Sequence, residues 1–152
     1  MTTLYTRLIL GVFVLFAIPI SITDIRSYRI PDSLSLSCFC IILAIRVFAL
    51  PESLPGHGGA ALFGGVLFFC VRLGTRGLGI GDIKFAALVG LLCGLPAAFL
   101  AFAIAAVTGI IGALVWRRLS TPDSGRDPGR PIPFAPFLSL GAAAAYCLSV
   151  FF

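Results

Sequence analysis

Two aspartates at the ends of long apolar runs are the residues of this sequence best placed to do chemistry. Asp24 follows the run Leu8–Ile22, and Asp82 lies in the segment Gly79-Ile80-Gly81-Asp82, just before another run. A carboxylate costs about 2.5–3.5 kcal/mol at the centre of a membrane helix and less near its ends, so such residues are candidates for function. Two carboxylates that approach each other share a proton, and such a pair activates water for attack on a carbonyl group.

The composition is that of an integral membrane protein. Of the 152 residues, 59% are hydrophobic and 11% are charged, whereas soluble domains average about 45–50% apolar and about 25% charged residues. The length fits a single domain over residues 1–152. The first apolar run leads into the charged segment at Asp24 without a small-x-small cleavage site, which favours a retained helix over a signal peptide.

Hydropathy predicts an all-α protein, a polytopic bundle of about six transmembrane helices. The third and fourth apolar runs are shorter than a full span, so they either borrow residues from flanking glycine-rich segments or lie tucked within the bundle. Gly94-Leu95-Pro96 predicts a tight turn, and residues 120–131 are expected to form a cytoplasmic connector. The expected spans are Leu8–Ile22, Leu34–Leu50, Ala60–Leu73, Ile83–Leu95, Ala97–Trp116 and Phe134–Phe152.

Basic residues set the predicted orientation, because they are enriched in cytoplasmic loops. The loops after spans one, three and five are basic, and those after spans two and four have no Lys or Arg. Asp24 and Asp82 are therefore expected at the same, cytoplasmic face, with both termini on the other side. Arg46, inside span two near its outer end, is expected to extend to the headgroups. The net charge of +5 is explained by this topology and not by a nucleic-acid partner.

The segment around Asp82 admits two interpretations. Gly79 and Gly81 permit close backbone approach, and a helix beginning at Ile83 would point its positive end at the carboxylate. Asp82 is equally suited to be a plain helix N-cap. Lys84 would either anchor the chain at the cytoplasmic face, or bias Asp82 electrostatically or hold a substrate backbone.

The segment after the first span has simpler interpretations. Asp24 could be a helix-terminal charge that faces headgroups and water. Asp32 follows Pro31 and is expected to cap the second span, which is a structural role.

Other catalytic and metal-binding chemistries find little support. His57 is expected on the outer side, far from both aspartates, so no Ser-His or Cys-His arrangement can be assembled. The five cysteines form no CxxC pair and lie mostly in apolar runs, where they are interpreted as small buried hydrophobic residues. No metal site and no cofactor are predicted.

Three separated motifs resemble those of the prepilin peptidase family, the GxGD aspartic proteases also called type IV leader peptidases. The first is Asp24 with Arg29-Ile30-Pro31-Asp32, and the second is Gly79-Ile80-Gly81-Asp82-Ile83-Lys84. The third is Ile132-Pro133-Phe134-Ala135-Pro136-Phe137-Leu138, in which Ala135 stands where the family commonly has glycine. The first and third motifs favour this branch over presenilin-like proteases.

The resemblance implies that Asp24 and Asp82 are the catalytic pair and that Gly79, Gly81, Lys84, Pro31, Asp32, Pro133, Phe134 and Pro136 support them. The implied substrate is a prepilin or pseudopilin with a short basic leader, cut at the cytoplasmic face of a bacterial inner membrane. Besides that substrate and the lipid bilayer, no partner is implied. Because the chain has no CxxC pair, it is expected to be of the short, peptidase-only type, without the N-terminal region linked to methyl transfer.

Three alternatives remain beside this hypothesis. A general GxGD intramembrane protease would cut inside the bilayer. A small ion-coupled transporter would use the aspartates to bind cations, although both lie at one face and no pair of broken helices marks an internal repeat. A non-catalytic assembly subunit of a secretion apparatus would tolerate replacement of both aspartates.

Overall fold

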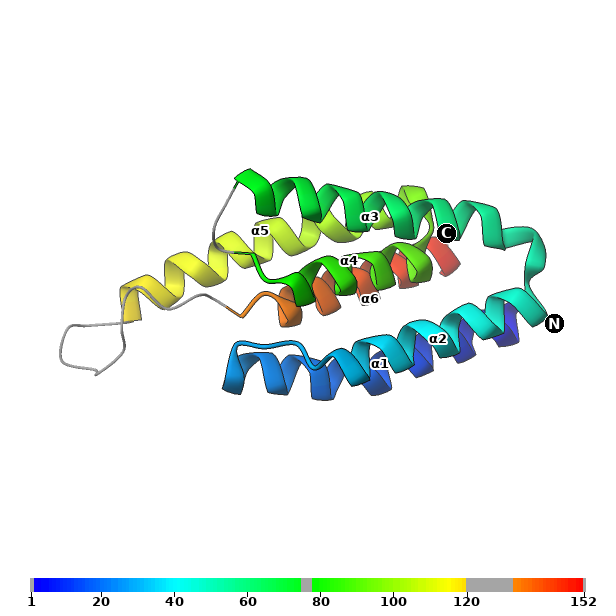
Figure 1. Cartoon of the computed structure of the whole chain (residues 1–152), viewed down its shortest axis with the longest axis horizontal. Coiled ribbons are helices and arrows are strands. Elements are labelled where there is room, and N and C mark those ends of the chain that lie inside the picture. The colour runs from blue at the N-terminus through cyan, green and yellow to red at the C-terminus, as the bar shows by residue number, and fades with distance from the viewer. Residues whose placement is uncertain (1, 75–77, 120–132, 152) are drawn as a thin grey trace.

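The computed structural model describes residues 2–74, 78–119 and 133–151 and shows helices throughout those segments, with no strand among them (Figure 1). The all-α prediction is therefore confirmed. The expected connector over residues 120–131 lies outside the described residues. The elements are α1 Thr2–Ser27, α2 Asp32–Ala49, the short 3-10 helix η1 Pro51–Ser53, α3 Leu54–Gly74, α4 Ile80–Cys93, α5 Leu95–Leu119 and α6 Ala135–Phe151.

Within the described residues, four helices are long and apolar enough to cross a membrane, namely Leu4–Ser27, Asp32–Ala49, Pro51–Gly74 and Leu95–Val115. The third run did borrow its flanking glycine-rich residues, because α3 begins at Leu54 and not at Ala60. Helix α1 continues past Ile22 to Ser27, so Asp24 lies inside the helix. Helix α4 has only 14 residues and is about 21 Å long, which is less than the thickness of the hydrocarbon core.

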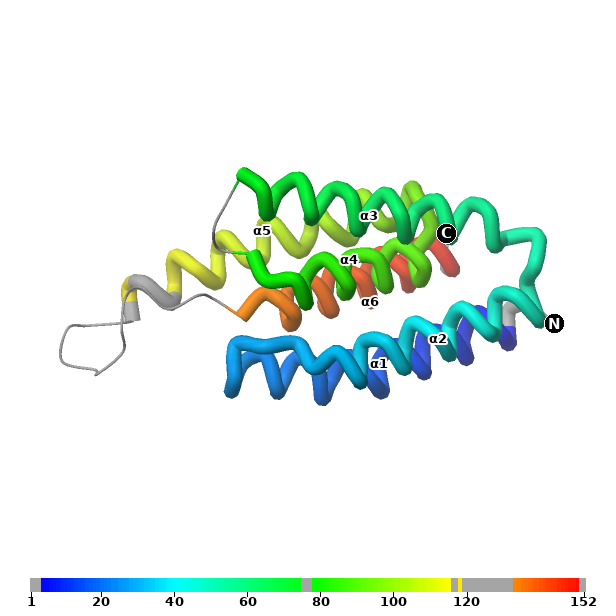
Figure 2. Tube along the Cα trace, in the orientation of Figure 1, coloured from blue at the N-terminus to red at the C-terminus, as the bar shows by residue number. Residues whose placement is uncertain are grey.

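Helix α4 is the centre of the bundle. It packs against α2, α3, α5 and α6, and Figure 2 shows it beside α6, between the α1–α2 pair and the α3–α5 pair. A helix that is apolar on every side belongs in a core, and eight consecutive residues after Lys84 fit this rule. Only Ala87 among them is partly exposed; the others are buried: Phe85, Ala86, Leu88, Val89, Gly90, Leu91 and Leu92.

Two glycines let α3 and α4 approach until their backbones touch. A Cβ on Gly64 of α3 would lie 2.6 Å from the carbonyl oxygen of Ala86 on α4. A Cβ on Gly90 of α4 would overlap the backbone of Ala60 and Ala61 on α3. Small residues at such crossings allow close van der Waals packing, which is a main source of helix association in membranes.

Arg46 binds the last carbonyl groups of α4, contrary to the expectation that this side chain extends to the headgroups. Arg46 is 3% exposed. Its Nε donates to the carbonyl oxygen of Leu91 at 2.9 Å, and its Nη2 donates to that of Leu92 at 2.7 Å. Because α4 stops short of a full span, its last carbonyl groups would otherwise lie unpaired in the bundle. The arginine turns inward for this reason.

The tight turn predicted at Gly94 is confirmed. Gly94 has φ +73°, in the region that favours glycine, and α5 begins at the next residue, Leu95. A Cβ at Gly94 would lie 3.1 Å from Nε2 of His57, which bonds the carbonyl oxygen of Ser53 through Nδ1 at 2.8 Å.

All five cysteines are free, but the burial predicted for them holds fully only for Cys38 and Cys93.

The close approach of α3 and α4 predicts the effect of adding a methyl group. Gly90→Ala forces the two backbones apart and should lower the free energy of unfolding by roughly 1–3 kcal/mol. Gly11→Ala is the matched control, since a methyl group on Gly11 of α1 would meet no atom within 4 Å. Thermal unfolding in detergent micelles measures both variants. Equal midpoints for the two would contradict the packing described above.

Candidate active site

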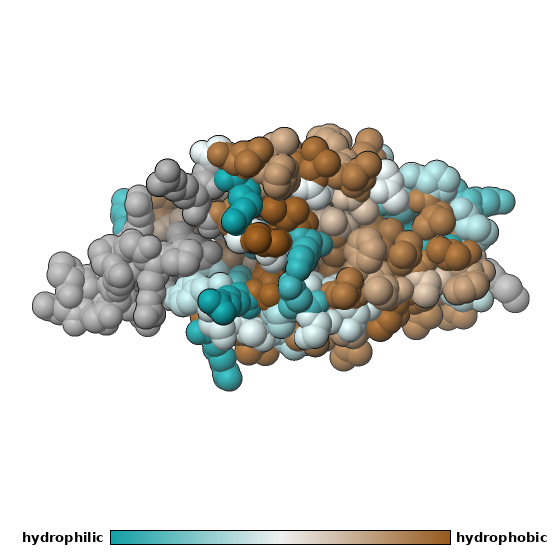
Figure 3. Space-filling model, viewed as in Figure 1, coloured by the Kyte–Doolittle hydropathy of each residue, from teal (hydrophilic) through white to brown (hydrophobic). Residues whose placement is uncertain are grey.

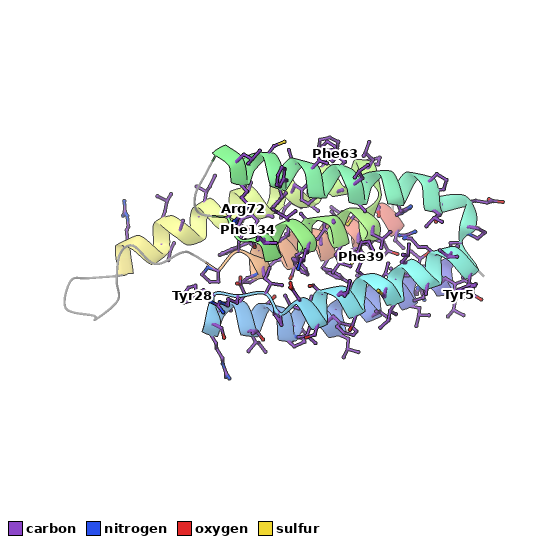
Figure 4. All side chains as sticks on the ribbon, in the orientation of Figure 1. Tyr5, Tyr28, Phe39, Phe63, Arg72 and Phe134 are labelled. Atoms are coloured by element: carbon purple, nitrogen blue, oxygen red, sulfur yellow. The ribbon has the colours of Figure 1, made fainter. Side chains whose placement is uncertain are left out.

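The last turn of α1 carries Asp24 and the first turn of α4 carries Asp82. Both turns lie at the end of the bundle opposite to η1 and to both chain ends (Figure 1). The two aspartates line one open pocket of about 550 Å³. Figure 4 shows labelled Tyr28, Arg72 and Phe134 toward the same end, and Tyr5 at the far end. The prediction that both aspartates lie at one end is confirmed by this common pocket. Its lining residues are Asp24, Tyr28, Arg29, Ile30, Pro31, Asp32, Gly79, Ile80, Gly81, Asp82 and Lys84.

Asp24 is held by the first residues of α6. It lies in the last turn of α1 and is 5% exposed. Its Oδ2 accepts a hydrogen bond from the backbone N–H of Ala135 at 2.9 Å, and the backbone N–H of Phe134 also interacts with the carboxyl group. A helix N-terminus offers unpaired N–H groups and a positive partial charge to an anion. The simpler interpretation of Asp24, a charge that faces headgroups and water, is therefore wrong.

The third motif supplies this helix N-terminus. Pro133 and Phe134 precede α6, and Pro136 is its second residue, where the missing N–H of proline removes a group that has no intrahelical partner. The alanine in place of the family's usual glycine contributes its backbone N–H and no side-chain chemistry. This explains why the substitution is compatible with the site.

Asp82 is held by its own helix. Helix α4 begins at Ile80 and not at Ile83, so Asp82 is the third helical residue and its plain N-cap interpretation is wrong. Its Oδ2 accepts a hydrogen bond from the backbone N–H of Gly79 at 2.8 Å. The carboxylate thus folds back over the first turn of α4, where a negative charge is favourable.

The two glycines of the GxGD motif are explained by what lies against them. A Cβ on Gly79 would lie 3.2 Å from Oδ2 of Asp82, and a Cβ on Gly81 would lie 2.9 Å from Cβ of Ile30. Gly79 therefore gives room to the returning carboxylate, and Gly81 gives room to the segment that follows α1. Gly81 thereby brings the first and second motifs into contact.

Charges around Asp82 act in opposite directions. Its side chain lies before the apolar part of α4. Burial raises the pKa of Asp82 above its ordinary value, the N–H of Gly79 lowers it, the negative charge of Asp24 raises it, and the positive charge of Arg72 lowers it. The net effect is a raised pKa. The repulsion between the aspartates is the electrostatic condition under which two carboxylates share a proton.

Arg72 was not singled out by the sequence as a site residue. It lies in the last turn of α3, and its Nη1 donates to the carbonyl oxygen of Leu78, directly before the GxGD motif. It thereby fixes the start of α4 and places a cation near Asp82. In the sequence, the positive charge of Arg72 indicated only the orientation in the membrane. No local pattern pairs this arginine with Leu78, which lies beyond the end of α3.

Lys84 and Asp32 form an ion pair across the mouth of the pocket. Nζ of Lys84 and Oδ2 of Asp32 are 2.7 Å apart, and the two side chains are 50% and 67% exposed. Asp32 does not cap α2; Pro31 occupies the N-cap position and no side chain caps the helix there. The ion pair instead joins the first turns of α2 and α4. The electrostatic role considered for Lys84 finds no support, because the charges that shift the pKa of Asp82 are those of Asp24 and Arg72.

Tyr28 turns the chain back over the pocket. Among the described residues it is the one non-glycine with a positive φ, +53°. Its N–H donates to the carbonyl oxygen of Asp24 at 2.8 Å, which closes the last turn of α1. The left-handed conformation costs about 1–2 kcal/mol in a residue with a Cβ. The turn brings residues 29–32 into the wall of the pocket.

This arrangement is suited to hydrolysis. Each aspartate has one carboxylate oxygen fixed by a backbone N–H, and both line a pocket open to water. Two anchored carboxyl groups with a shared proton can deprotonate a water molecule and hydrogen-bond a carbonyl oxygen.

The position of Arg72 predicts a change in the titration of Asp82. Removing its positive charge in Arg72→Met removes an interaction that favours the carboxylate, so the pKa of Asp82 should rise further. Infrared spectra with isotope-labelled aspartate measure the protonated carboxyl group as pH is varied, and Asp82→Asn assigns the signal. Arg72→Lys, which keeps the charge, should shift the pKa less. A lower pKa in Arg72→Met would contradict the prediction.

Comparison with known proteins adds to this geometry. The profile of the type IV leader peptidase family matches residues 11–114. The prepilin leader peptidase/N-methyltransferase of Pectobacterium carotovorum subsp. carotovorum is 26% identical over 142 residues, which cover 90% of this chain and 50% of that protein. The protein of the same name in Bacillus subtilis (strain 168) is 30% identical over 141 residues, 89% of this chain and 53% of that protein.

The protein of the same name in Escherichia coli (strain K12) is 30% identical over 148 residues, which cover 91% of this chain and 63% of that protein. The chain spans about half the length of the curated relatives it matches. No solved structure matches it. Because the family profile covers most of the sequence and includes both aspartates, the chain belongs to the type IV leader peptidase family.

Proposed function

We propose that this chain is a membrane aspartic endopeptidase that removes the short basic leader from type IV prepilins or pseudopilins. The observation that carries the proposal is the pocket that Asp24 and Asp82 share. Family membership supports the substrate class, since its relatives are named for cutting prepilin leaders. The methyl transfer in the names of those relatives is not carried over, and we assign leader removal alone to these residues.

The proposed mechanism uses both aspartates and a water molecule. The pair holds one proton between its two carboxyl groups. The ionised carboxylate takes a proton from water while the water oxygen attacks the carbonyl carbon of the scissile peptide bond. The protonated carboxyl group hydrogen-bonds the carbonyl oxygen. The C–N bond then breaks, and the leaving nitrogen takes a proton from the pair, which restores its single-proton state.

The supporting residues have proposed roles that follow from their contacts. The N–H groups of Gly79 and Ala135 fix the two carboxylates, and Arg72 keeps the pKa of Asp82 from rising further. Gly81 permits the contact with Ile30, and Pro133, Phe134 and Pro136 present the start of α6. The pair of Asp32 and Lys84 holds the starts of α2 and α4 together at the pocket mouth.

We propose that the pocket faces the cytoplasm of a bacterial cell and that both termini lie on the other side of the inner membrane. Arg26, Arg29, Arg72 and Lys84 all belong to the end of the bundle that holds the aspartates. The excess of basic residues at cytoplasmic ends supports this orientation. A basic leader would then remain in the cytoplasm while the adjoining apolar segment lies in the bilayer.

The first experiment is cleavage of co-expressed type IV prepilins by wild type, Asp24→Asn and Asp82→Asn. Each replacement removes a group that the mechanism requires to exchange a proton, so leader removal should fall by at least about a thousandfold. Glu52→Gln is the control, because Glu52 is an exposed carboxylate in η1 at the opposite end. Immunoblots of membranes check insertion. Normal cleavage by a well-inserted Asp24→Asn or Asp82→Asn protein would refute the catalytic pair.

The position of the pocket at the bundle end also limits where the substrate can be cut. A prepilin whose scissile bond is moved one helical turn, about 5.4 Å, toward the bilayer centre should be cleaved more slowly. Adding the same number of polar residues at the far end of the leader leaves the depth unchanged and serves as the control. Gel-shift of the processed product measures both. Full cleavage at the deeper site would favour the general intramembrane protease.

A further inference from the structure

A trough runs along α4 from the aspartate pocket toward the opposite end of the bundle. Helices α2 and α3 both pack against α4, and neither is a main packing partner of the other. They are joined at the η1 end and diverge toward the aspartate end (Figure 1). Residues of all three helices line the apolar cavity described below, so α4 forms its floor and α2 and α3 form its walls.

Three cavities follow one another along this trough. The middle cavity, of about 310 Å³, shares Asp32 and Lys84 with the aspartate pocket. The apolar cavity, of about 520 Å³, shares Phe39 and Ala87 with the middle cavity. Because adjacent cavities share lining side chains, the three lie in a row along α4. We call this row of cavities the α4 groove, and the residues of its two lower sections that matter here are Phe39, Gly58, Ala61, Gly65 and Ala87.

The chemistry of the α4 groove changes along its length. Its upper section holds carboxylates and cations. The middle cavity has the Asp32–Lys84 pair on one side and Phe39 on the other. Below it, every lining side chain of the apolar cavity is apolar or absent. Figure 3 shows this face with apolar surface between polar side chains toward the two ends.

Small residues leave room for a helix in the apolar cavity. A Cβ on Gly58 would have no neighbour within 4 Å, and the nearest neighbour of a Cβ on Gly65 would be Cβ of Ala87 at 3.6 Å. Ala61 lies between these glycines on α3. Small residues let the backbone of another membrane helix come close. From Ile83 to Leu91 the floor spans about 12 Å, or a little over two helical turns.

We propose that the α4 groove binds the apolar transmembrane helix of the substrate, on the side of the scissile bond that remains with the mature product. This inference rests on the proposed peptidase function. A polypeptide cut at the aspartates continues from the pocket into the groove, passes from polar to apolar surroundings at the Asp32–Lys84 pair, and packs as a helix against α3 and α4. A lipid chain or a second copy of this chain would fit the apolar cavity alone, but neither accounts for its place in one row with the aspartate pocket.

The test compares two substrates on groove variants of the full chain in nanodiscs. One substrate is an intact type IV prepilin, and the other is a soluble peptide with the same leader and cut site but without the apolar helix. Ala87→Phe and Gly58→Phe fill the groove at two depths. Gly11→Phe is the matched control, because Gly11 is an exposed position on α1 with an equally open surrounding and lies outside the groove.

We expect both groove variants to raise KM for the intact prepilin by about tenfold with little change in kcat. KM for the soluble peptide should be unchanged in both, and Gly11→Phe should resemble wild type on both substrates. A photo-crosslinking amino acid at position 87 should capture the apolar helix of a cleavage-resistant prepilin, and one at position 11 should not. This readout does not depend on either phenylalanine variant folding.

Other results would overturn the inference in distinguishable ways. Unchanged KM for the intact prepilin, or crosslinks only to lipid or to a second copy, would show that the groove does not hold the substrate helix. An equal rise in KM for both substrates would show damage to the aspartate pocket. Failure of wild type to cut any prepilin would refute the proposed function, and this inference with it.

Discussion

A short buried helix is the constraint on which the rest of the structure depends. Helix α4 has 14 residues, too few to cross a bilayer, and yet it carries Asp82, packs against α2, α3, α5 and α6 and also contacts α1. Both its ends therefore need partners within the protein. Arg46 supplies them at the Leu91 and Leu92 carbonyls, and the Asp82 carboxylate supplies one at Gly79. The close contacts at Gly64 and Gly90 then fix the position of α4 along α3, and with it the position of the Asp82 carboxylate.

The two aspartates are positioned by the same kind of hydrogen bond. Each carboxylate receives a hydrogen bond from a backbone N–H at the start of a helix, α4 for Asp82 and α6 for Asp24. Backbone donors on helices move little, so they hold a carboxyl group more firmly than a flexible side chain would. The starts of α2 and α4 line the pocket, and the start of α6 binds Asp24. Their partial positive charges offset the cost of gathering three aspartates there.

Sequence patterns predicted the parts of this structure that depend on local composition. Apolar runs located the helices, and counting spans placed Asp24 and Asp82 at one end. The start of α4 was misplaced because Ile80 and Gly81 precede Asp82 without a polar capping residue. Long-range pairings were not predicted: Lys84 with Asp32, Arg72 with Leu78, and Ala135 with Asp24. The direction of the Arg46 side chain was predicted wrongly, because it depends on where α4 ends.

The contact between Asp24 and Ala135 joins residues 111 positions apart, in the first and last helices of the described chain. During synthesis, α1 enters the bilayer long before α6 exists. Until then the Asp24 carboxyl group lacks its backbone partner and has to remain hydrated or protonated at the membrane boundary. The arrangement of Asp24 is thus completed only when α6 arrives, after the other helices have entered the bilayer.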